Sequence, residues 1–141
     1  IRSRMEILLD NYIKTIQIES LTMVELTKKD ILPAIVAYTS ELSAAALDKR
    51  ALSEDIDISV ELDTVRRLSS LAACIKSDAE KLEHALAEVR VYPTAAEQAS
   101  FCRTVVFVAM QQLRASADEA ETLVSAKHWP FPTYGELLYS I

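Results

Sequence analysis

Val65–Val89 has the sequence VRRLSSLAACIKSDAEKLEHALAEV, in which apolar residues recur every three or four positions. The stripe consists of Val65, Leu68, Ala72, Ile75, Ala79, Leu82, Leu86 and Val89. This spacing follows one face of a helix, and about 3.5 heptads of it are typical of the inner face of an antiparallel bundle. We therefore predict a long helix here, which Val91-Tyr92-Pro93 ends.

Two further long helices are predicted on either side of this one. The downstream helix has the stripe Cys102, Val106, Met110, Leu113, Ala117, Ala120 and Val124. The upstream helix runs from about Arg4 into the forties, has the stripe Met5, Leu8, Tyr12, Ile16 and Met23, and is followed by a linker at 51–57. Capping boxes, in which a hydroxyl and a glutamate three residues later satisfy free amides, start helices at Ser3, Thr94 and Thr133.

Pro33 interrupts the upstream helix. Proline removes one backbone hydrogen bond and clashes with the carbonyl four residues back, so we expect a kink or a break near Asp30. Asp30 would then cap a second segment, with Pro33 in its first turn.

Composition agrees with an all-α fold. The chain has 141 residues, of which 50% are apolar and 26% are charged, as in one globular domain. Gly135 is the only glycine, which excludes a Rossmann fingerprint, a P-loop and most barrels and sandwiches. We predict a single helical domain over residues 1–141, an antiparallel bundle of three long helices plus a short C-terminal helix.

The upstream helix is apolar on more than one side, because Ile7, Ile18 and Leu21 lie outside its stripe. Two interpretations stay open. Either this face meets something outside the chain, or the bend at Pro33 lets both faces pack internally.

Charge and cysteine content restrict the partners and the compartment. The net charge is -6 and no basic run exceeds two residues, which disfavours nucleic acid. The longest uncharged stretches are about half a membrane span, so we expect no membrane insertion. Cys74 and Cys102 are too few for a disulfide framework and suit a reducing cytoplasm.

No residue is assigned a catalytic, cofactor-binding or metal-binding role. His84, His128, Cys74 and Cys102 are scattered without the spacing of metal ligands. Core thiols and surface or partly buried imidazoles are the commoner arrangement of such residues.

Residues 128–141 form an aromatic and proline-rich strap, HWPFPTYGELLYSI, with a terminal helix capped by Thr133. Prolines keep such a segment extended, and its rings offer a large apolar area. Its candidate docking residues are Trp129, Phe131, Tyr134, Leu137 and Leu138. We favour packing of Trp129 and Phe131 on the chain's own bundle over docking on another domain.

The strap and the preceding Asp118–Val124 resemble the C-terminus of the type III glutamine synthetases, the large bacterial form of the enzyme. Glu6–Ile16, Ile18-Glu19, Thr22-Met23 and Asp30–Ala34 are similar to the stretch that follows that family's catalytic region. The resemblance spans essentially the whole chain, and the strap is its most specific part. The chain begins at Ile1, with Met5 as its first methionine, so we expect a piece of a longer chain.

The resemblance implies a non-catalytic C-terminal domain of an ATP-dependent glutamate–ammonia ligase of nitrogen metabolism. It implies ATP and Mg²⁺ or Mn²⁺ for the parent enzyme, held by its upstream catalytic part, and an oligomer of double hexameric rings. The implied partners are the catalytic domain of the same chain and neighbouring subunits. A free-standing helical interaction module is the alternative; a bundle enzyme or metal carrier is disfavoured.

Overall fold

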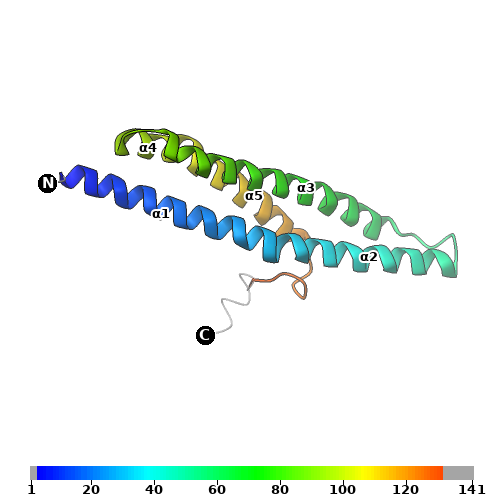
Figure 1. The fold of residues 1–141 in the computed structure, drawn as a ribbon. Helices are drawn as coiled ribbons and strands as arrows, with labels where there is room; N and C mark the ends of the chain where they lie inside the picture. The colour runs from blue at the N-terminus through cyan, green and yellow to red at the C-terminus, as the bar shows by residue number, and fades with distance from the viewer. Residues whose placement is uncertain (1–2, 132–141) are drawn as a thin grey trace, which may run out of the picture.

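The structure, a computed structural model, describes residues 3–131, in which every regular element is a helix. The elements are α1 (Arg4–Leu26), a π-helical turn η1 (Thr27–Ile31), α2 (Leu32–Leu52), α3 (Ser59–Glu88), a 3₁₀ turn η2 (Val89–Val91), α4 (Ala95–Phe101), a π-helical turn η3 (Cys102–Val106) and α5 (Phe107–Leu123). They join into three rods, which confirms the predicted all-α fold with three long helices (Figure 1). The short terminal helix predicted from Thr133 lies outside the described residues.

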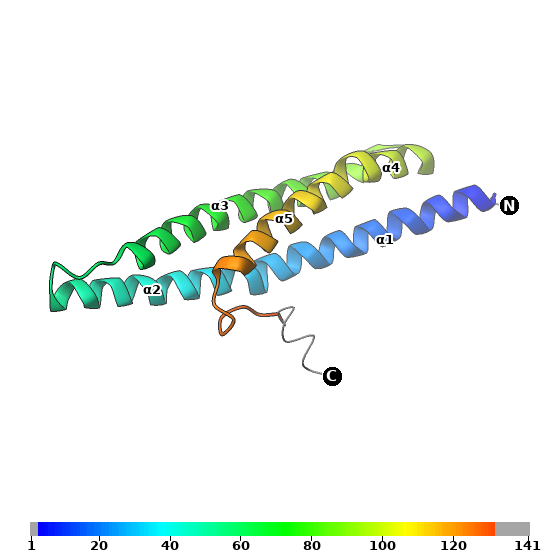
Figure 2. The ribbon, with the colours of Figure 1, turned by 180° about the vertical axis from the view of Figure 1, so that it is seen from behind.

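The rods differ in length, and this difference shapes the molecule. α3 folds back on α2 and continues along α1, while α4 lies beside the N-terminal end of α1 (Figures 1 and 2). α5 then returns along α3 but stops near the middle of the long α1–α2 rod. The far end of the α2–α3 hairpin therefore extends beyond the third helix.

Pro33 does not break the first rod, so the predicted break is wrong. The single π-helical turn η1 precedes the proline, with the N–H of Leu32 donating to the carbonyl of Thr27. A wider turn absorbs the local misfit that proline brings to an α-helix. The predicted cap at Asp30 is also wrong, because that residue lies inside the turn, and a kink stays a prediction. The linker is shorter than predicted, since α2 continues to Leu52.

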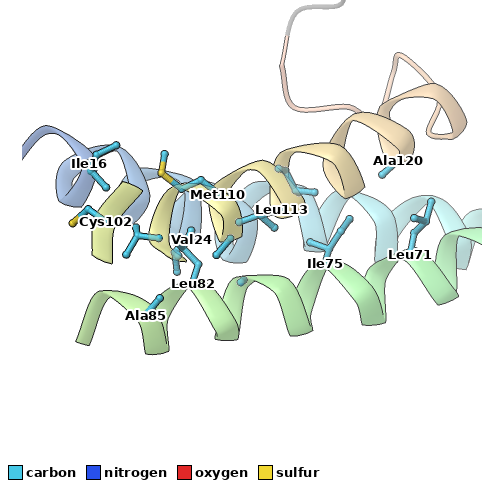
Figure 3. Close-up of a cluster of buried hydrophobic side chains, with 14 of the residues drawn as sticks. Ile16, Val24, Leu71, Ile75, Leu82, Ala85, Cys102, Met110, Leu113 and Ala120 are labelled. Carbon is cyan, nitrogen blue, oxygen red and sulfur yellow. The ribbon is translucent and has the colours of Figure 1, made fainter. Parts of the chain in front are cut away.

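The core joins α1, α3 and α5, as the predicted stripes require. Leu68, Ile75 and Leu82 of α3 are fully buried. They share one cluster with Met110 and Leu113 of α5, and Figure 3 shows Ile75 and Leu82 facing these two residues. Leu71, Asp78 and Ala85 are also buried, so the inward face of α3 is wider than the single predicted stripe.

The stripe predicted for α1 needs correction. Met5 and Leu8 are exposed, whereas the buried face follows Ile13, Ile16, Ser20, Val24 and Thr27 and continues to Ile31 and Ile35. Two members of this face are polar: Thr27 donates from its hydroxyl to the carbonyl of Met23 at 2.7 Å, and Ser20 has no hydrogen-bond partner in the described chain. A search for apolar periodicity passes over such small hydroxyl residues.

Two predicted capping boxes are confirmed on their hydroxyl side. The hydroxyl of Ser3 accepts from the N–H of Glu6 at 3.2 Å, and that of Thr94 accepts from the N–H of Glu97 at 3.2 Å. α3 starts differently, because the Asp57 carboxylate accepts from the N–H of Ser59 at 2.8 Å. This bond from the Ser59 backbone holds the pKa of Asp57 below its usual value.

A polar contact also links α3 to α5. The carboxylate of Asp78 is buried and accepts from the Ser116 hydroxyl at 2.9 Å, with the Cys74 thiol 3.7 Å away. A buried carboxylate with such partners holds α5 at one position along α3.

Candidate docking surfaces

The outer face of α1 carries the apolar side chains that fall off its buried stripe. Ile7 is 47% exposed, Ile18 65% and Leu21 59%. Ile18 follows Ile7 by about three helical turns, so the two share one side of the helix, away from the core. Within residues 3–131 these side chains are exposed, and contact of this face with something outside the chain stays a prediction.

A groove lies beside this face, between α1 and the C-terminal part of α3. It has a volume of about 440 Å³ and is lined by Gln17, Leu21, Glu83, Leu86, Ala87 and Arg90. The Lys28 ammonium forms an ion pair with Glu83 at 2.6 Å and ties the two helices together. Leu21 therefore belongs to both the outer face of α1 and the wall of a groove.

The strap begins where α5 ends, and its first part packs on the chain itself. Trp129 is only 9% exposed and belongs to the core cluster. Phe131 is half-buried and meets the indole edge-on, with ring centroids 6.0 Å apart. Of the remaining candidate docking residues, Tyr134, Leu137 and Leu138 lie outside the described residues.

His128 anchors the strap to α2, a role that the sequence did not suggest. Its Nε2 lies 2.6 Å from the Glu41 carboxylate, and its Nδ1 lies 2.8 Å from the Ser125 hydroxyl. Its ring also packs on Tyr38, with centroids 5.1 Å apart. Donation from Nε2 to Glu41 and a hydrogen bond between Nδ1 and Ser125 satisfy both ring nitrogens and fix the direction of the chain that leads to Trp129.

The end of the α2–α3 hairpin is a further exposed surface, which the sequence did not predict. We call residues 42–65 the hairpin tip. Leu47, Leu52 and Val60 there are 71%, 82% and 73% exposed. The sequence of α2 could have indicated this surface, because its apolar residues lie on all sides of the helix. Ile35 is the only residue of α2 that is buried.

The candidate catalytic and metal-binding side chains do not converge. Within residues 3–131, no group of three or more His, Cys, Asp or Glu side chains is placed to hold a metal ion. Cys102 is buried, and desolvation raises the pKa of its thiol, which disfavours the reactive thiolate.

No helix in residues 3–131 has the length and hydropathy that would let it cross a membrane.

Similarity to known proteins agrees with this picture of a helical domain with exposed faces. Residues 1–50 match the family described as the glutamine synthetase C-terminal domain. The whole chain is 39% identical over 141 residues to a glutamine synthetase of Butyrivibrio fibrisolvens, of which it covers 20%. Over 146 residues that include 99% of the chain, it is 25% identical to a type-3 glutamine synthetase of Dictyostelium discoideum, again covering 20%.

The fold defines an all-helical domain whose notable features are apolar surfaces. The comparisons show similarity to glutamine synthetase C-terminal domains, and the predicted resemblance to the type III enzymes is confirmed. The chain spans about a fifth of the length of the curated relatives it matches.

Proposed function

We propose that this chain is a non-catalytic structural domain of a type III glutamine synthetase and packs on the catalytic domain or on a neighbouring subunit. The observation that carries the proposal is the outer face of α1. Ile7, Ile18 and Leu21 give this helix a second apolar side that the bundle leaves exposed. Exposed apolar side chains on one side of a helix favour an interface.

The parent enzyme would ligate ammonia to glutamate at the expense of ATP, in the cytoplasm. In this proposal the catalytic region binds ATP and Mg²⁺ or Mn²⁺, while the present domain contributes no ligand to either. It would instead stabilise the contacts between subunits of a homo-oligomer. Cys74 and Cys102 as free thiols support a reducing compartment.

Substitution of the outer face of α1 in the complete synthetase tests the proposal. The variant Ile7→Ser, Ile18→Ser and Leu21→Ser replaces exposed side chains, so the helical content should stay unchanged. We expect the assembly to dissociate in sedimentation velocity and the specific activity to fall with it. A matched control, Val36→Ser with Val91→Ser, changes residues that are 58% and 77% exposed elsewhere. An intact assembly of the α1 variant would contradict the proposal.

The alternative is a free-standing interaction module that binds a partner helix in the groove between α1 and α3. The volume of this groove, about 440 Å³, and its apolar side chains Leu21 and Leu86 favour it. Sequencing the gene upstream of Ile1 distinguishes the two. A reading frame that continues into a catalytic region supports the synthetase domain, and one that starts just before Ile1 supports the module.

A further inference from the structure

Within residues 3–131, the hairpin tip lacks the third helix that the rest of the bundle has. Arg67 of α3 forms an ion pair with Glu119 near the end of α5, and His128 of the strap meets Glu41 of α2. These contacts mark how far the third rod and the strap reach along the hairpin. Beyond them, α2 and α3 of the described chain pack only on each other, as Figures 1 and 2 show.

A groove runs between the two helices of the hairpin tip. Its volume is about 280 Å³, and its lining includes the apolar side chains of Ala46, Leu47, Ile58, Leu62 and Val65. The exposed residues Leu52 and Val60 extend this apolar surface around the end of the hairpin. The groove thus lies where a third helix would complete the bundle.

Only one of the two carboxylate oxygens of Glu61, which lines this groove, has a hydrogen-bond partner in the described chain. The residue is only 8% exposed, and its Oε1 accepts from the Lys49 ammonium at 3.1 Å. Its Oε2 is buried and has no partner among the described residues. A buried carboxylate oxygen without a donor is costly, so a donor brought to this side chain would stabilise it.

The hairpin tip is also strongly acidic. Residues 42–65 contain six Asp or Glu and two Lys or Arg, so most of the net charge of -6 lies there. Among the described residues, Glu61 is the only one of these acids that forms an ion pair. An occupant of the groove should therefore combine apolar side chains with positive charge.

The outer face of η3 and α5 has this combination. Val105, Phe107 and Val108 are 42%, 42% and 46% exposed. Arg103 and Arg114 are also exposed, share the side of the helix that carries Phe107, and pair with no carboxylate of the described chain. From Gln98 to Ala117 the sequence contains no Asp or Glu at all. We call Arg103, Phe107, Val108 and Arg114 the basic face.

We propose that the hairpin tip binds the basic face of a second copy of this chain, as the missing third helix of its groove. An arginine of the partner would then supply the donor that Glu61 lacks. Because the two surfaces differ, a single contact leaves one of each unused. A two-fold arrangement exchanges both contacts and closes the dimer. This pairing does not use the outer face of α1, so it and the proposed function can fail separately.

Reciprocal charge reversal tests this pairing. The face variant Arg103→Glu with Arg114→Glu makes the basic face acidic. The tip variant Glu54→Lys, Asp55→Lys and Asp63→Lys leaves three acids and five bases in residues 42–65. Each variant alone should dimerise at least roughly tenfold more weakly than the unchanged chain in sedimentation equilibrium, because both of its contacts oppose like charges.

Mixing the two variants gives the sharper result. Every contact of the mixed dimer again opposes unlike charges, so equimolar mixing should restore association to near the level of the unchanged chain. Added salt should weaken it, as for any contact with exposed charges. The control Lys14→Glu with Lys76→Glu makes the same charge change on α1 and α3 and should leave the dimer intact.

Three outcomes would overturn the proposal. These are a chain that stays monomeric at every concentration, a dimer that both charge variants leave unchanged, and a mixture that fails to restore association. Circular dichroism of each variant checks that the helices persist, so that a loss of pairing is not a loss of folding. Dissociation by Ile18→Ser in place of the charge variants would assign the dimer to the outer face of α1 instead.

Discussion

The apolar side chains of α3 are buried in one region of the molecule and exposed in another. In its C-terminal two thirds, Leu68, Ile75 and Leu82 are completely buried beneath the first rod and α5. In the hairpin tip, Val60 is 73% exposed and Leu62 is 39% exposed. Both regions are rich in apolar residues, so composition does not explain the difference. The length of the third rod does, because α5 ends where the hairpin tip begins.

The largest effect is expected from truncating a core leucine. Leu82→Ala removes a side chain that is fully buried among three helices and leaves a cavity, which costs about 2–5 kcal/mol of unfolding free energy. Leu47→Ala in the hairpin tip makes the same chemical change at a residue that is 71% exposed, and its cost should stay within about 0.5 kcal/mol. Urea melts of both variants measure the contrast. Equal losses would mean that the two regions are equally packed.

A second contrast concerns carboxylates. Asp78 is buried between α3 and α5 and accepts from Ser116, so Asp78→Ala leaves that hydroxyl without its partner. We expect a loss of about 1–3 kcal/mol in urea unfolding. Asp63→Ala in the hairpin tip removes an exposed carboxylate and should change little. If Asp78→Ala proves neutral, the contact does not hold α5 in place.

Much of the well-packed region is predictable from the sequence alone. The stripe through Leu68, Ile75 and Leu82 repeats without interruption, and an apolar periodicity of this length leaves little choice of buried face. The same reasoning fails on α1. Ser20 and Thr27 lie on its buried face although they are polar, because the neighbouring helices and not the hydropathy of the segment decide what they cover.

The surfaces are harder to predict because they depend on contacts between distant segments. Ile7, Ile18 and Leu21 are exposed, as predicted for the outer face of α1. This face could be predicted because a second apolar side is a local property of one helix. The hairpin tip was missed, because it exists only where α5 stops short of α2 and α3. The pairing of His128 with Glu41 was missed for a related reason: nothing in either local sequence indicates the other.

The strap closes the well-packed region at the border of the hairpin tip, and His128 is expected to hold it there. His128→Ala removes the contacts to Glu41 and Ser125, and we expect a stability loss of about 1 kcal/mol, since Glu41 is largely exposed. Trp129, the only tryptophan, reports the local effect. Its emission should be blue-shifted in the unchanged chain and shift to the red, with stronger iodide quenching, in the variant. His84→Ala, an exposed histidine on α3, should leave the emission unchanged.

The smallest effect is expected where the hairpin tip buries its own carboxylate. Glu61→Met keeps the length and approximate volume of the side chain but removes a charge whose Oε2 has no partner. The ion pair lost with it is weak, because the Lys49 side chain is 46% exposed and returns to water. Replacing a poorly satisfied buried charge by an apolar group is often neutral or stabilising. We therefore expect the unfolding free energy to stay within about 1 kcal/mol of the unchanged chain or to rise.

Asp78→Met is the matched substitution in the well-packed region. It should destabilise the chain, because it removes the acceptor of the Ser116 hydroxyl and places a longer side chain between α3 and α5. Measured at dilutions where the chain is monomeric, a marked loss for Glu61→Met would show that its carboxylate is satisfied within the single chain, and the hairpin tip would then be no less complete than the rest of the bundle.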